Sequence, residues 1–261
     1  MIQAEAAAET LLREHDERRS FHSLRDEYAL NDLRQSYDIQ AHVVRRLCAR
    51  NNVSLAGYKI GLTSPRMQTM CGIPHPISGS VLRSRVHASG GAVALRNFVH
   101  LGVECEIAVR MGRDVGQGRG SSTIEEMAEA IDAVAPALEL VEDRHADYKS
   151  LDMLTLVADN SWNAGIVLGE FRQDWPDLAA IEGVVERNGE TLDRGFGRDV
   201  MGHPFVPLLW LSQHLAARGE LLRAGDIVMT GSITPTYFPI PGERIRFSLG
   251  ELGSVEYMFK V

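Results

Sequence analysis

Two apolar segments that carry three glutamates constrain this chain more than any other feature. Val103–Ile107 and Pro136–Val141 are rich in the residue types that favour strands. Because side chains alternate along a strand, Glu104 and Glu106 project from one face, and Glu139 sits among apolar neighbours in the second segment. Burying a lone carboxylate costs several kcal/mol unless it is paired or bound to a cation. The fold must therefore either supply a partner for these groups or leave their face open to water.

The glutamates allow two interpretations. Three carboxylates brought together would repel one another, and a divalent ion is the simplest remedy. Cys105 points to the opposite face, and no histidine or cysteine lies at ligand spacing beside all three glutamates. An all-oxygen set favours Mg²⁺, Mn²⁺ or Ca²⁺ over Zn²⁺. The alternative is the ordinary solvated face of an antiparallel sheet, and spacing alone leaves both interpretations open.

The composition narrows the class of protein. At 261 residues, with 44% hydrophobic and 24% charged residues, the chain has the make-up of a globular protein with one large core. Its net charge of −8 (27 minus 35) and its lack of basic runs argue against nucleic acid as a partner. No apolar stretch approaches the roughly 20 residues that cross a membrane, and residues 1–20 lack the apolar stretch of a signal peptide. Three scattered cysteines indicate a reducing compartment, so we expect a cytoplasmic protein.

Periodicity predicts a helical front and a β-rich remainder. Residues 4–20 and 28–50 are typical of helices, so we divide the chain into a helical part at 1–55 and a β-rich part at 56–261, within one structural unit. Turn and capping signals predict further elements. These are a shaped loop at 72–79, a helix from Ser122 or Thr123 to about Val134, a hairpin at Asn188-Gly189, a helix over 203–218 and a closing hairpin over 244–259.

Lys59 and His75 are candidates for a site, and each has an ordinary alternative. Lys59 lies on a predicted strand between Gly57 and Gly61. Glycine within a strand often marks the close approach of a ligand or another backbone, although a solvated lysine on an edge strand is common. His75 lies in the 72–79 loop and is either a substrate contact or a surface histidine.

Two groups of small polar residues are further candidates. Asn160 and Ser161 belong to the segment 159–165, which is rich in amides and hydroxyls and is either a turn or the polar wall of a site. Thr230 and Ser232 end the buried-looking strand 226–232, where hydroxyl and backbone N–H groups could hold a carboxylate.

Several of these segments occur together in the order of a known family. The matching segments are Lys59–Ser64, Gly102–Glu106, Pro136–Asp143, Asp159-Asn160, Gly202–Pro204 and Gly225–Ser232. Each is modest alone, but six in order are specific, and they cover about residues 35–261. The chain resembles the 2-oxopent-4-enoate hydratase / 4-oxalocrotonate decarboxylase family within the fumarylacetoacetate hydrolase superfamily.

The resemblance implies an α+β fold, with a mixed β-roll core of the fumarylacetoacetate hydrolase C-terminal type and a helical N-terminal part. It also implies Mg²⁺ or Mn²⁺ on Glu104, Glu106 and Glu139, with Lys59 as the active-site lysine. The substrate would be a small 2-oxo acid. We assign substrate binding to Asn160, Ser161, Thr230 and Ser232. The family favours a homo-oligomer, and a partner enzyme of the same pathway is a further candidate partner.

One departure from the family pattern bears on the reaction. The family usually has an aspartate after the proline of the 72–79 loop, where it is a candidate acid–base group. Here Pro76 is followed by Ile77 and Ser78, neither of which titrates usefully. His75 is adjacent and could take over proton transfer near neutral pH.

We therefore expect a metal-dependent lyase that hydrates a 2-hydroxydienoate or 2-oxoalkenoate to a 4-hydroxy-2-oxo acid in the catabolism of ring-cleavage products. Decarboxylation of a 2-oxo dicarboxylate of the 4-oxalocrotonate type is the second candidate. Hydrolysis of a C–C bond in an acylpyruvate is a third. A weakly active partner subunit is a fourth, motivated by the missing aspartate.

Overall fold

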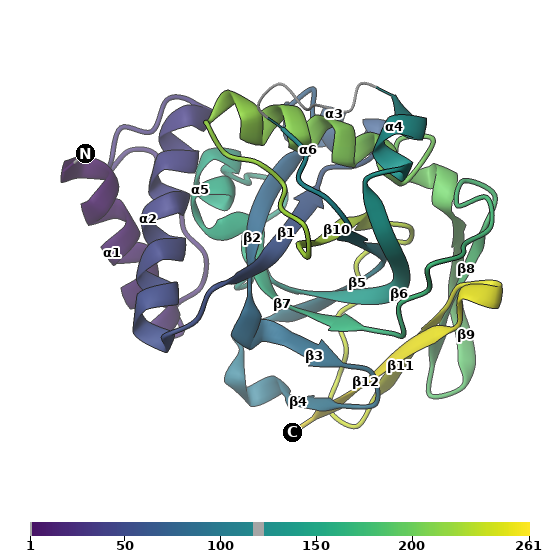
Figure 1. Ribbon diagram of the computed structural model, residues 1–261. Helices are drawn as coiled ribbons and strands as arrows, with labels where there is room; N and C mark the ends of the chain where they lie inside the picture. The colour runs from purple at the N-terminus through teal and green to yellow at the C-terminus, as the bar shows by residue number, and fades with distance from the viewer. Residues whose placement is uncertain (1, 117–122) are drawn as a thin grey trace.

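The computed structural model describes residues 2–116 and 123–261, in which a helical N-terminal region lies beside two β-sheets (Figure 1). The N-terminal helices occupy one side of the molecule, and α6 crosses the top of the sheets in this view. The helices of the described residues are α1 (Ile2–Asp16), α2 (Leu33–Asn51), α3 (Pro65–Cys71), α4 (Ile124–Ala128), α5 (Met153–Ala158) and α6 (Phe205–Ala217).

The strands of the described residues form a seven-stranded and a five-stranded sheet. The first has the order β2-β1-β10-β5-β6-β7-β3, and the second has the order β4-β12-β11-β8-β9. Their bounds are β1 (Leu55–Gly61), β2 (Ile77–Leu82), β3 (Val86–Ala88), β4 (Ala92–Ala94), β5 (Leu101–Met111), β6 (Ile131–Glu142), β7 (Asn163–Leu168), β8 (Glu182–Arg187), β9 (Glu190–Phe196), β10 (Ile227–Ser232), β11 (Arg244–Ser248) and β12 (Ser254–Lys260).

The antiparallel pair β5–β6 lies in the middle of the larger sheet. It keeps one register from Leu101, opposite Glu142, to Arg110, opposite Ala133. Apolar residues of β5 such as Val103 and Ile107 are buried in the main hydrophobic core together with residues of the second sheet and of α6. Since alternate residues face opposite ways, burial of this apolar face directs the glutamates of β5 to the other face.

The N-terminal helices pack against the sheet through α5 and a buried arginine. Apolar residues of α1 and α2 form one cluster with residues of α5. Arg144, just after β6, is fully buried and lies 3.2 Å from Glu14 of α1 and 2.7 Å from Asp159. This charge-paired contact fixes the position of the segment that follows α5.

The structure confirms most predicted elements and corrects two. The two N-terminal helices, the hairpin at Asn188-Gly189, the helix within 203–218 and the closing hairpin are present. The predicted extent of the 72–79 loop is wrong at its C-terminal end, because β2 begins at Ile77 and pairs with β1. The helix to Val134 is also wrong: α4 ends at Ala128, because pairing with β5 draws the alanine-rich segment into β6. Thr123 caps α4 as predicted, whereas Ser122 lies outside the described residues.

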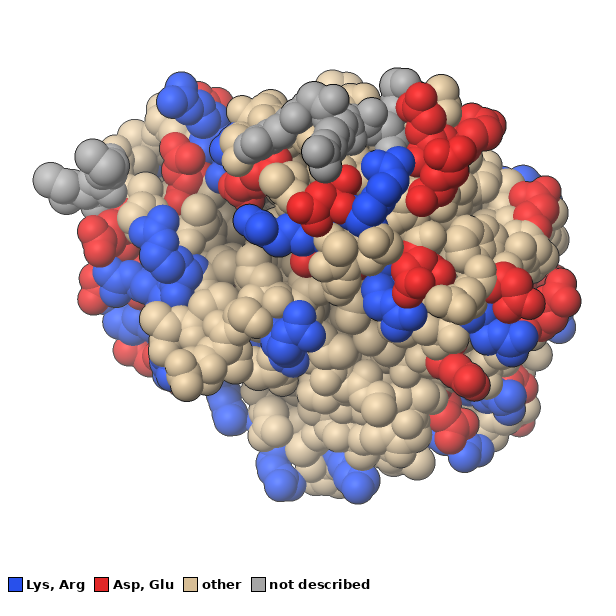
Figure 2. Space-filling model, in the orientation of Figure 1, with Lys and Arg blue, Asp and Glu red and all other residues tan. Residues whose placement is uncertain are grey.

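The distribution of charge on the surface agrees with the acidic net charge and the lack of basic runs in the sequence. Figure 2 shows acidic and basic side chains interspersed on the face in view, without a continuous basic surface. In the part of the chain that is described, no helix combines the length and the apolar character that a membrane crossing requires.

Candidate metal centre

The three predicted glutamates meet on one face of the β5–β6 pair. Glu104 lies directly opposite Glu139 in the register, and Glu106 follows two residues later on the same face. One carboxylate oxygen of each lies within 4.8 Å of the others. Glu106 and Glu139 are fully buried, and Glu104 is partly exposed. The interpretation as a solvated sheet face therefore does not hold.

Each carboxylate is held through one oxygen. Glu106 Oε2 accepts a hydrogen bond from the backbone N–H of Gly231 at 2.8 Å. Glu139 Oε1 accepts one from the side-chain amide of Asn163 at 2.9 Å. Glu104 Oε1 accepts one from the Thr236 hydroxyl at 2.6 Å.

The carboxylate oxygens that accept no hydrogen bond are suited to bind a cation. Glu106 Oε1 and Glu139 Oε2 are buried and have no hydrogen-bond partner among the described residues. Buried polar atoms without partners are rare, and each calls for an explanation such as an ion. Hard oxygen ligands suit Mg²⁺, Mn²⁺ or Ca²⁺. The residues present therefore fit a divalent metal that Glu104, Glu106 and Glu139 would hold.

Lys59 completes the cluster. Its Nζ lies 3.2 Å from Glu139 Oε1, and the residue is 4% exposed. Burial alone would lower the pKa of Lys59, but the charges of Glu139, Glu104 and Glu106 outweigh burial and raise it. The lysine is therefore a cation at neutral pH, and the interpretation as a solvated edge lysine is excluded.

The carboxylates carry more negative charge than one lysine balances. Burial, followed by the charges of Glu139 and Glu104, raises the pKa of Glu106 well above its ordinary value. Burial also raises the pKa of Glu139, although Lys59 and Asn163 oppose the shift. A divalent cation would supply the missing positive charge and reverse these shifts.

Two glycines allow this packing. A side chain at Gly57 would collide with the backbone of Ile227 on the adjacent strand β10, so the glycine marks close approach of a backbone. Gly231, whose N–H holds Glu106, has φ +113° and lies against Thr63, so a side chain there would be both strained and obstructed.

The predicted substrate-binding residues lie in the turn after α5 and at the end of β10, and their side chains make internal hydrogen bonds. The Asn160 side chain pairs with both backbone groups of Ser80 at 2.7 and 2.9 Å. The Ser161 hydroxyl donates to the carbonyl of Ser78 at 2.7 Å. The hydroxyl of Thr230 donates to the Ile107 carbonyl at 2.9 Å, and that of Ser232 donates to the Thr234 carbonyl at 2.7 Å. Their roles toward a substrate stay predictions.

His75 lies against α6. Its ring stacks on Trp210 with centroids 6.0 Å apart, and its Nδ1 lies 2.7 Å from the Pro76 carbonyl. Ile77, at the position where the family usually has an aspartate, is buried beside Gly61 on the face of Lys59. The structure does not show His75 in contact with the glutamates, and its role also stays a prediction.

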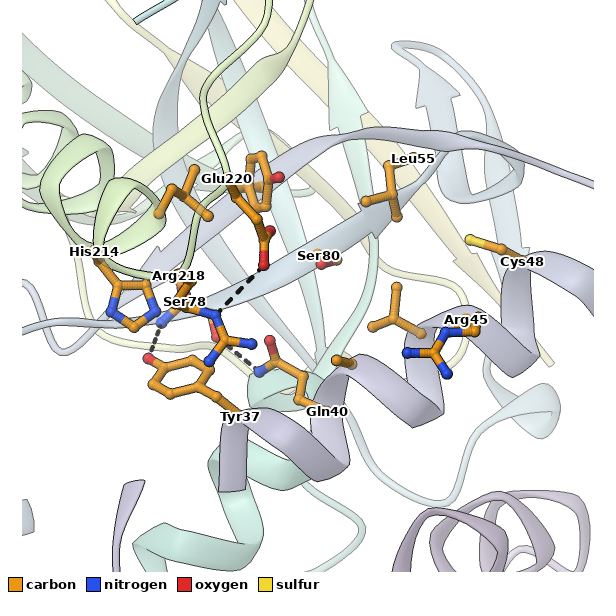
Figure 3. A pocket seen from close by; sticks show the side chains of 14 residues that line it. Tyr37, Gln40, Arg45, Cys48, Leu55, Ser78, Ser80, His214, Arg218 and Glu220 are labelled. Carbon is orange, nitrogen blue, oxygen red and sulfur yellow. Dashed lines mark hydrogen bonds and ion pairs between the residues drawn. The ribbon is translucent and has the colours of Figure 1, made fainter. Parts of the chain in front are cut away.

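A separate cavity of about 260 Å³ opens on the other face of β1 and β2 (Figure 3). Tyr58 lines it, whereas the neighbouring Lys59 points to the glutamates. Arg218 and Glu220 form an ion pair at 3.5 Å in its wall. His214 also lines it, and burial, followed by the charge of Arg218, lowers its pKa to about 4. This cavity is not part of the glutamate cluster.

The residues that hold the glutamates were not assigned from the sequence. Asn163 belongs to the polar 159–165 segment, so its composition was a usable signal. Thr236 lies in an irregular, proline-containing segment that follows β10, and nothing in the sequence indicates that this segment returns to Glu104.

Comparisons with known proteins agree with this geometry. The family model described as fumarylacetoacetate (FAA) hydrolase C-terminal matches residues 72–260. The chain is 32% identical over 261 residues to 2-keto-4-pentenoate hydratase 1 of Dechloromonas aromatica (strain RCB), covering 99% of this chain and 98% of that protein. It is 33% identical over 251 residues to 4-oxalocrotonate decarboxylase of Pseudomonas putida, covering 95% and 92%.

Solved structures lead to the same family. The 4-oxalocrotonate decarboxylase from Pseudomonas putida G7, complexed with magnesium and adipate, matches with a TM-score of 0.91 and 29% identity, covering 98% of this chain and 97% of that chain. These matches confirm the predicted α+β fold with its mixed β-roll core and helical N-terminal part. The chain belongs to the family of 2-keto-4-pentenoate hydratases and 4-oxalocrotonate decarboxylases, within the fumarylacetoacetate hydrolase superfamily.

Proposed function

We propose that the chain is a divalent-metal-dependent lyase acting on a small 2-oxo acid, and that it hydrates a 2-hydroxydienoate or 2-oxoalkenoate to a 4-hydroxy-2-oxo acid. The observation that carries the proposal is the cluster of three glutamates beside a buried lysine, with two buried carboxylate oxygens that lack a partner among the described residues. The hydratases and decarboxylases among the relatives support the reaction class.

Glu104, Glu106 and Glu139 would hold Mg²⁺ or Mn²⁺, and the magnesium complex of the related decarboxylase supports this choice. When bound, the metal supplies a Lewis acid that stabilises the enolate developing at the 2-oxo group of the substrate.

Lys59 contributes a fixed positive charge inside a water-poor site. Its ammonium group would stabilise the negative charge that develops on the 2-oxo oxygen and would donate a proton to the adjacent carbon when the enolate collapses. Burial by Ile77 and the backbone of β10 keeps water from screening this charge.

Decarboxylation of a 2-oxo dicarboxylate is the second candidate, and Ile77 favours it. Loss of CO₂ requires a place for the electron pair but no activated water, so an apolar residue at position 77 is compatible with it. A C–C hydrolase of an acylpyruvate is less well supported, because the relatives that match over nearly the whole chain at 32–33% identity are hydratases and decarboxylases. A weakly active partner subunit is also less well supported, because it would have no need for a complete charged cluster.

An assay with two substrates separates hydration from decarboxylation. Purified protein with Mg²⁺ is given a 2-hydroxydienoate, and loss of diene absorbance is followed; 4-oxalocrotonate is tested for release of CO₂. We expect turnover of at least one of them, with loss of activity on chelation of the metal. No turnover of either substrate, with metal present, would contradict the proposal.

His75 as the substitute acid–base group is a proposal with its own test. His75→Ala should lower kcat at least about tenfold if the imidazole transfers a proton during hydration. His42→Ala, on α2, is the matched control. Unchanged turnover of His75→Ala between pH 6 and 8 would remove this role.

The remaining expectations are also proposals. We propose that the chain forms a homo-oligomer, that it acts in the cytoplasm on products of ring cleavage, and that its parts 1–55 and 56–261 form one structural unit. Light scattering on the purified protein tests the first, and a single cooperative melting transition tests the last.

A further inference from the structure

The cavity of about 260 Å³ between α2, the end of α6 and the strand pair β1–β2 lies apart from the glutamates (Figure 3). Tyr58 lies opposite Ser80 in the strand register, and both residues line the cavity. Lys59 lies opposite Gly79, and its side chain points to the glutamates on the other face. The cavity is therefore behind the strand that carries Lys59, and a ligand bound at the glutamates does not fill it.

The side-chain amide of Gln40 presents its oxygen to this cavity. Gln40 is 7% exposed, and its Nε2 donates hydrogen bonds to the carbonyls of Ser78 at 2.9 Å and Val157 at 2.7 Å. Because these two bonds use both amide hydrogens, they fix the orientation of the group. Figure 3 shows the amide turned into the cavity, where Oε1 has no hydrogen bond to any described residue.

A buried hydroxyl also lines the cavity. Ser80 is 8% exposed, and its backbone N–H and carbonyl both pair with the side chain of Asn160. Its hydroxyl has no hydrogen-bond partner in the part of the chain that the structure describes. Since buried polar groups are normally hydrogen-bonded, the Gln40 oxygen and the Ser80 hydroxyl together indicate that a polar molecule fills the cavity.

Arg45 supplies a positive charge at the edge of the cavity. It lies one helical turn after Ala41 on α2, and both residues line the cavity. The next residue, Arg46, pairs with Glu5 of α1. Arg45 itself is exposed and makes no ion pair or hydrogen bond with a described residue, so its guanidinium group is available to an anion.

The other groups of the cavity wall add no net charge. Arg218 and Glu220 pair at 3.5 Å. Burial, followed by the charge of Arg218, lowers the pKa of His214 to about 4, so this imidazole is neutral at pH 7. Burial, followed by the charge of Glu220, raises the pKa of Tyr58 to about 12, so its hydroxyl stays protonated. The wall therefore carries the single net positive charge of Arg45, which suits a monoanion better than a dianion such as a phosphate monoester.

The size and the apolar part of the wall limit the rest of the ligand. Ala41, Val44, Leu55 and Leu215 contribute apolar surface. The volume of about 260 Å³ lies just below the roughly 300–1,000 Å³ of pockets that hold drug-sized ligands. A short carbon chain with polar ends matches both properties.

The positions of the polar groups determine what those ends are. Gln40 and Arg45 are five residues apart on α2, which is about 7.5 Å along the helix axis at about 1.5 Å per residue. An anionic group at Arg45 and a polar group at Gln40 therefore belong at opposite ends of the chain. The amide oxygen of Gln40 can only accept, so the group that meets it must donate. A hydroxyl can donate to Gln40 and accept from the Ser80 hydroxyl, whereas an oxo group cannot donate.

We propose that this cavity is a second ligand site, which binds a small monocarboxylic acid that carries a hydroxyl group at the far end of a short carbon chain. Arg45 binds the carboxylate, and Gln40 and Ser80 bind the hydroxyl. The site is separate from the glutamates, and the inference does not depend on the proposed function.

The test uses 4-hydroxypentanoate, which lacks the 2-oxo group of a metal-chelating acid. The protein is first saturated with Mg²⁺ and oxalate to occupy the glutamates, and affinity is then measured by ligand-observed NMR. The wild-type protein should bind 4-hydroxypentanoate about fivefold or more tightly than pentanoate, which lacks the hydroxyl. It should bind it about tenfold or more tightly than 1,4-pentanediol, which lacks the carboxylate.

Two variants assign the ends of the ligand. Arg45→Gln should weaken the binding of 4-hydroxypentanoate about tenfold, to the level of the diol. Ser80→Ala should reduce the preference over pentanoate to about twofold or less, because it removes the hydroxyl that orients the ligand. Neither side chain makes a hydrogen bond to a described residue, so both variants should fold, and melting curves check this. Arg34→Gln, which replaces another exposed arginine of α2 outside the cavity, is the matched control and should keep the wild-type affinity.

The outcomes separate a ligand site from a cavity that holds only water. Saturable binding with these ratios, lost in the Arg45 variant and kept in the Arg34 variant, supports the second site. No binding of 4-hydroxypentanoate at millimolar concentration would overturn the inference. Equal affinities for the acid and the diol, or binding that is unchanged in both cavity variants, would overturn it as well.

Discussion

The two faces of the strand pair β1–β2 treat charge in opposite ways. On one face Lys59 is 4% exposed and lies 3.2 Å from Glu139, within a cluster that has an excess of carboxylates. On the other face Arg218 and Glu220 pair at 3.5 Å with side chains 24% and 48% exposed (Figure 3).

The difference separates charge kept for function from ordinary surface charge. Water screens the second pair, so it contributes little and costs little. The first cluster takes charge out of water without balancing it, which destabilises the fold unless a cation is added. Such a cluster lowers the stability of the metal-free protein, and this contrast with the screened pair supports a metal site at the glutamates.

Of the changes considered, Glu106→Gln should most strongly reduce the difference in charge between the buried cluster and the screened pair. It removes a carboxylate that would hold the metal, so we expect activity to fall at least about a thousandfold. The same change relieves repulsion in the metal-free protein, where unfolding free energy should rise by about 1 kcal/mol or more, or roughly 2–4 °C in Tm. Activity assays and melting in EDTA check both parts. A lower metal-free Tm would show that the carboxylates are not in excess.

Lys59→Met should lower kcat by about 10²–10⁴ while Mg²⁺ still binds, because it removes the cation and proton donor without touching the glutamates. The metal-free protein should also lose stability, since the buried carboxylates then have no counter-charge. Calorimetry with Mg²⁺ and steady-state kinetics separate binding from chemistry. Loss of Mg²⁺ binding, with kcat per bound metal unchanged, would contradict the role of Lys59.

The stability of the metal-free protein should fall as pH rises. Folding raises the pKa values of Glu106 and Glu139 above 4.5. Groups whose pKa is raised by folding contribute stability that is complete below about pH 4.5 and is lost as pH rises through the folded-state pKa. A tenfold difference in proton affinity between the folded and unfolded states corresponds to about 1.4 kcal/mol. Tm measured in EDTA between pH 5 and 8 should therefore decrease, and Mg²⁺ should flatten the decrease.

Glu106→Gln is the control for this pH dependence, because other groups also contribute to it. The raised pKa of His15 acts in the same direction, whereas the lowered pKa values of His87, His203 and His214 act in the opposite direction. The slope that remains in the variant belongs to other groups. Equal slopes in the wild-type and variant proteins would show that the glutamates do not titrate as described.

The smallest effect is expected on the other face. Arg218→Ala should change unfolding free energy by no more than about 1 kcal/mol, because the pair with Glu220 is screened by water. It should leave turnover within about twofold. Urea unfolding and kinetics check this, and a large loss of activity would show that the two faces are coupled.

The strands and the chemistry of the glutamates could be predicted because local pattern determines them. Val, Ile and Leu around Glu104 and Glu106 fix the alternation of side chains, and the resemblance to the family predicts a divalent metal at the glutamates. The register of Glu104 opposite Glu139 could not be predicted, because it depends on pairing between segments 35 residues apart.

The errors have the same physical origin. Residues 129–134 have helix-favouring alanines, but the long ladder with β5 overrides that preference. Ile77 follows two prolines, but pairing with Gly61 makes it the first residue of a strand. Thr236 reaches Glu104 only through tertiary packing, which no local pattern records.

The most direct test of the metal site is the effect of Mg²⁺ on melting. A ligand of the folded state at about 100 times its Kd adds about 2.7 kcal/mol, which corresponds to roughly 5–10 °C for a chain of this size. We expect Mg²⁺ to raise the Tm of the wild-type protein by about this amount and to leave that of Glu139→Gln unchanged. Equal shifts in both proteins, or no shift in the wild-type protein at millimolar Mg²⁺, would contradict a metal site at these glutamates.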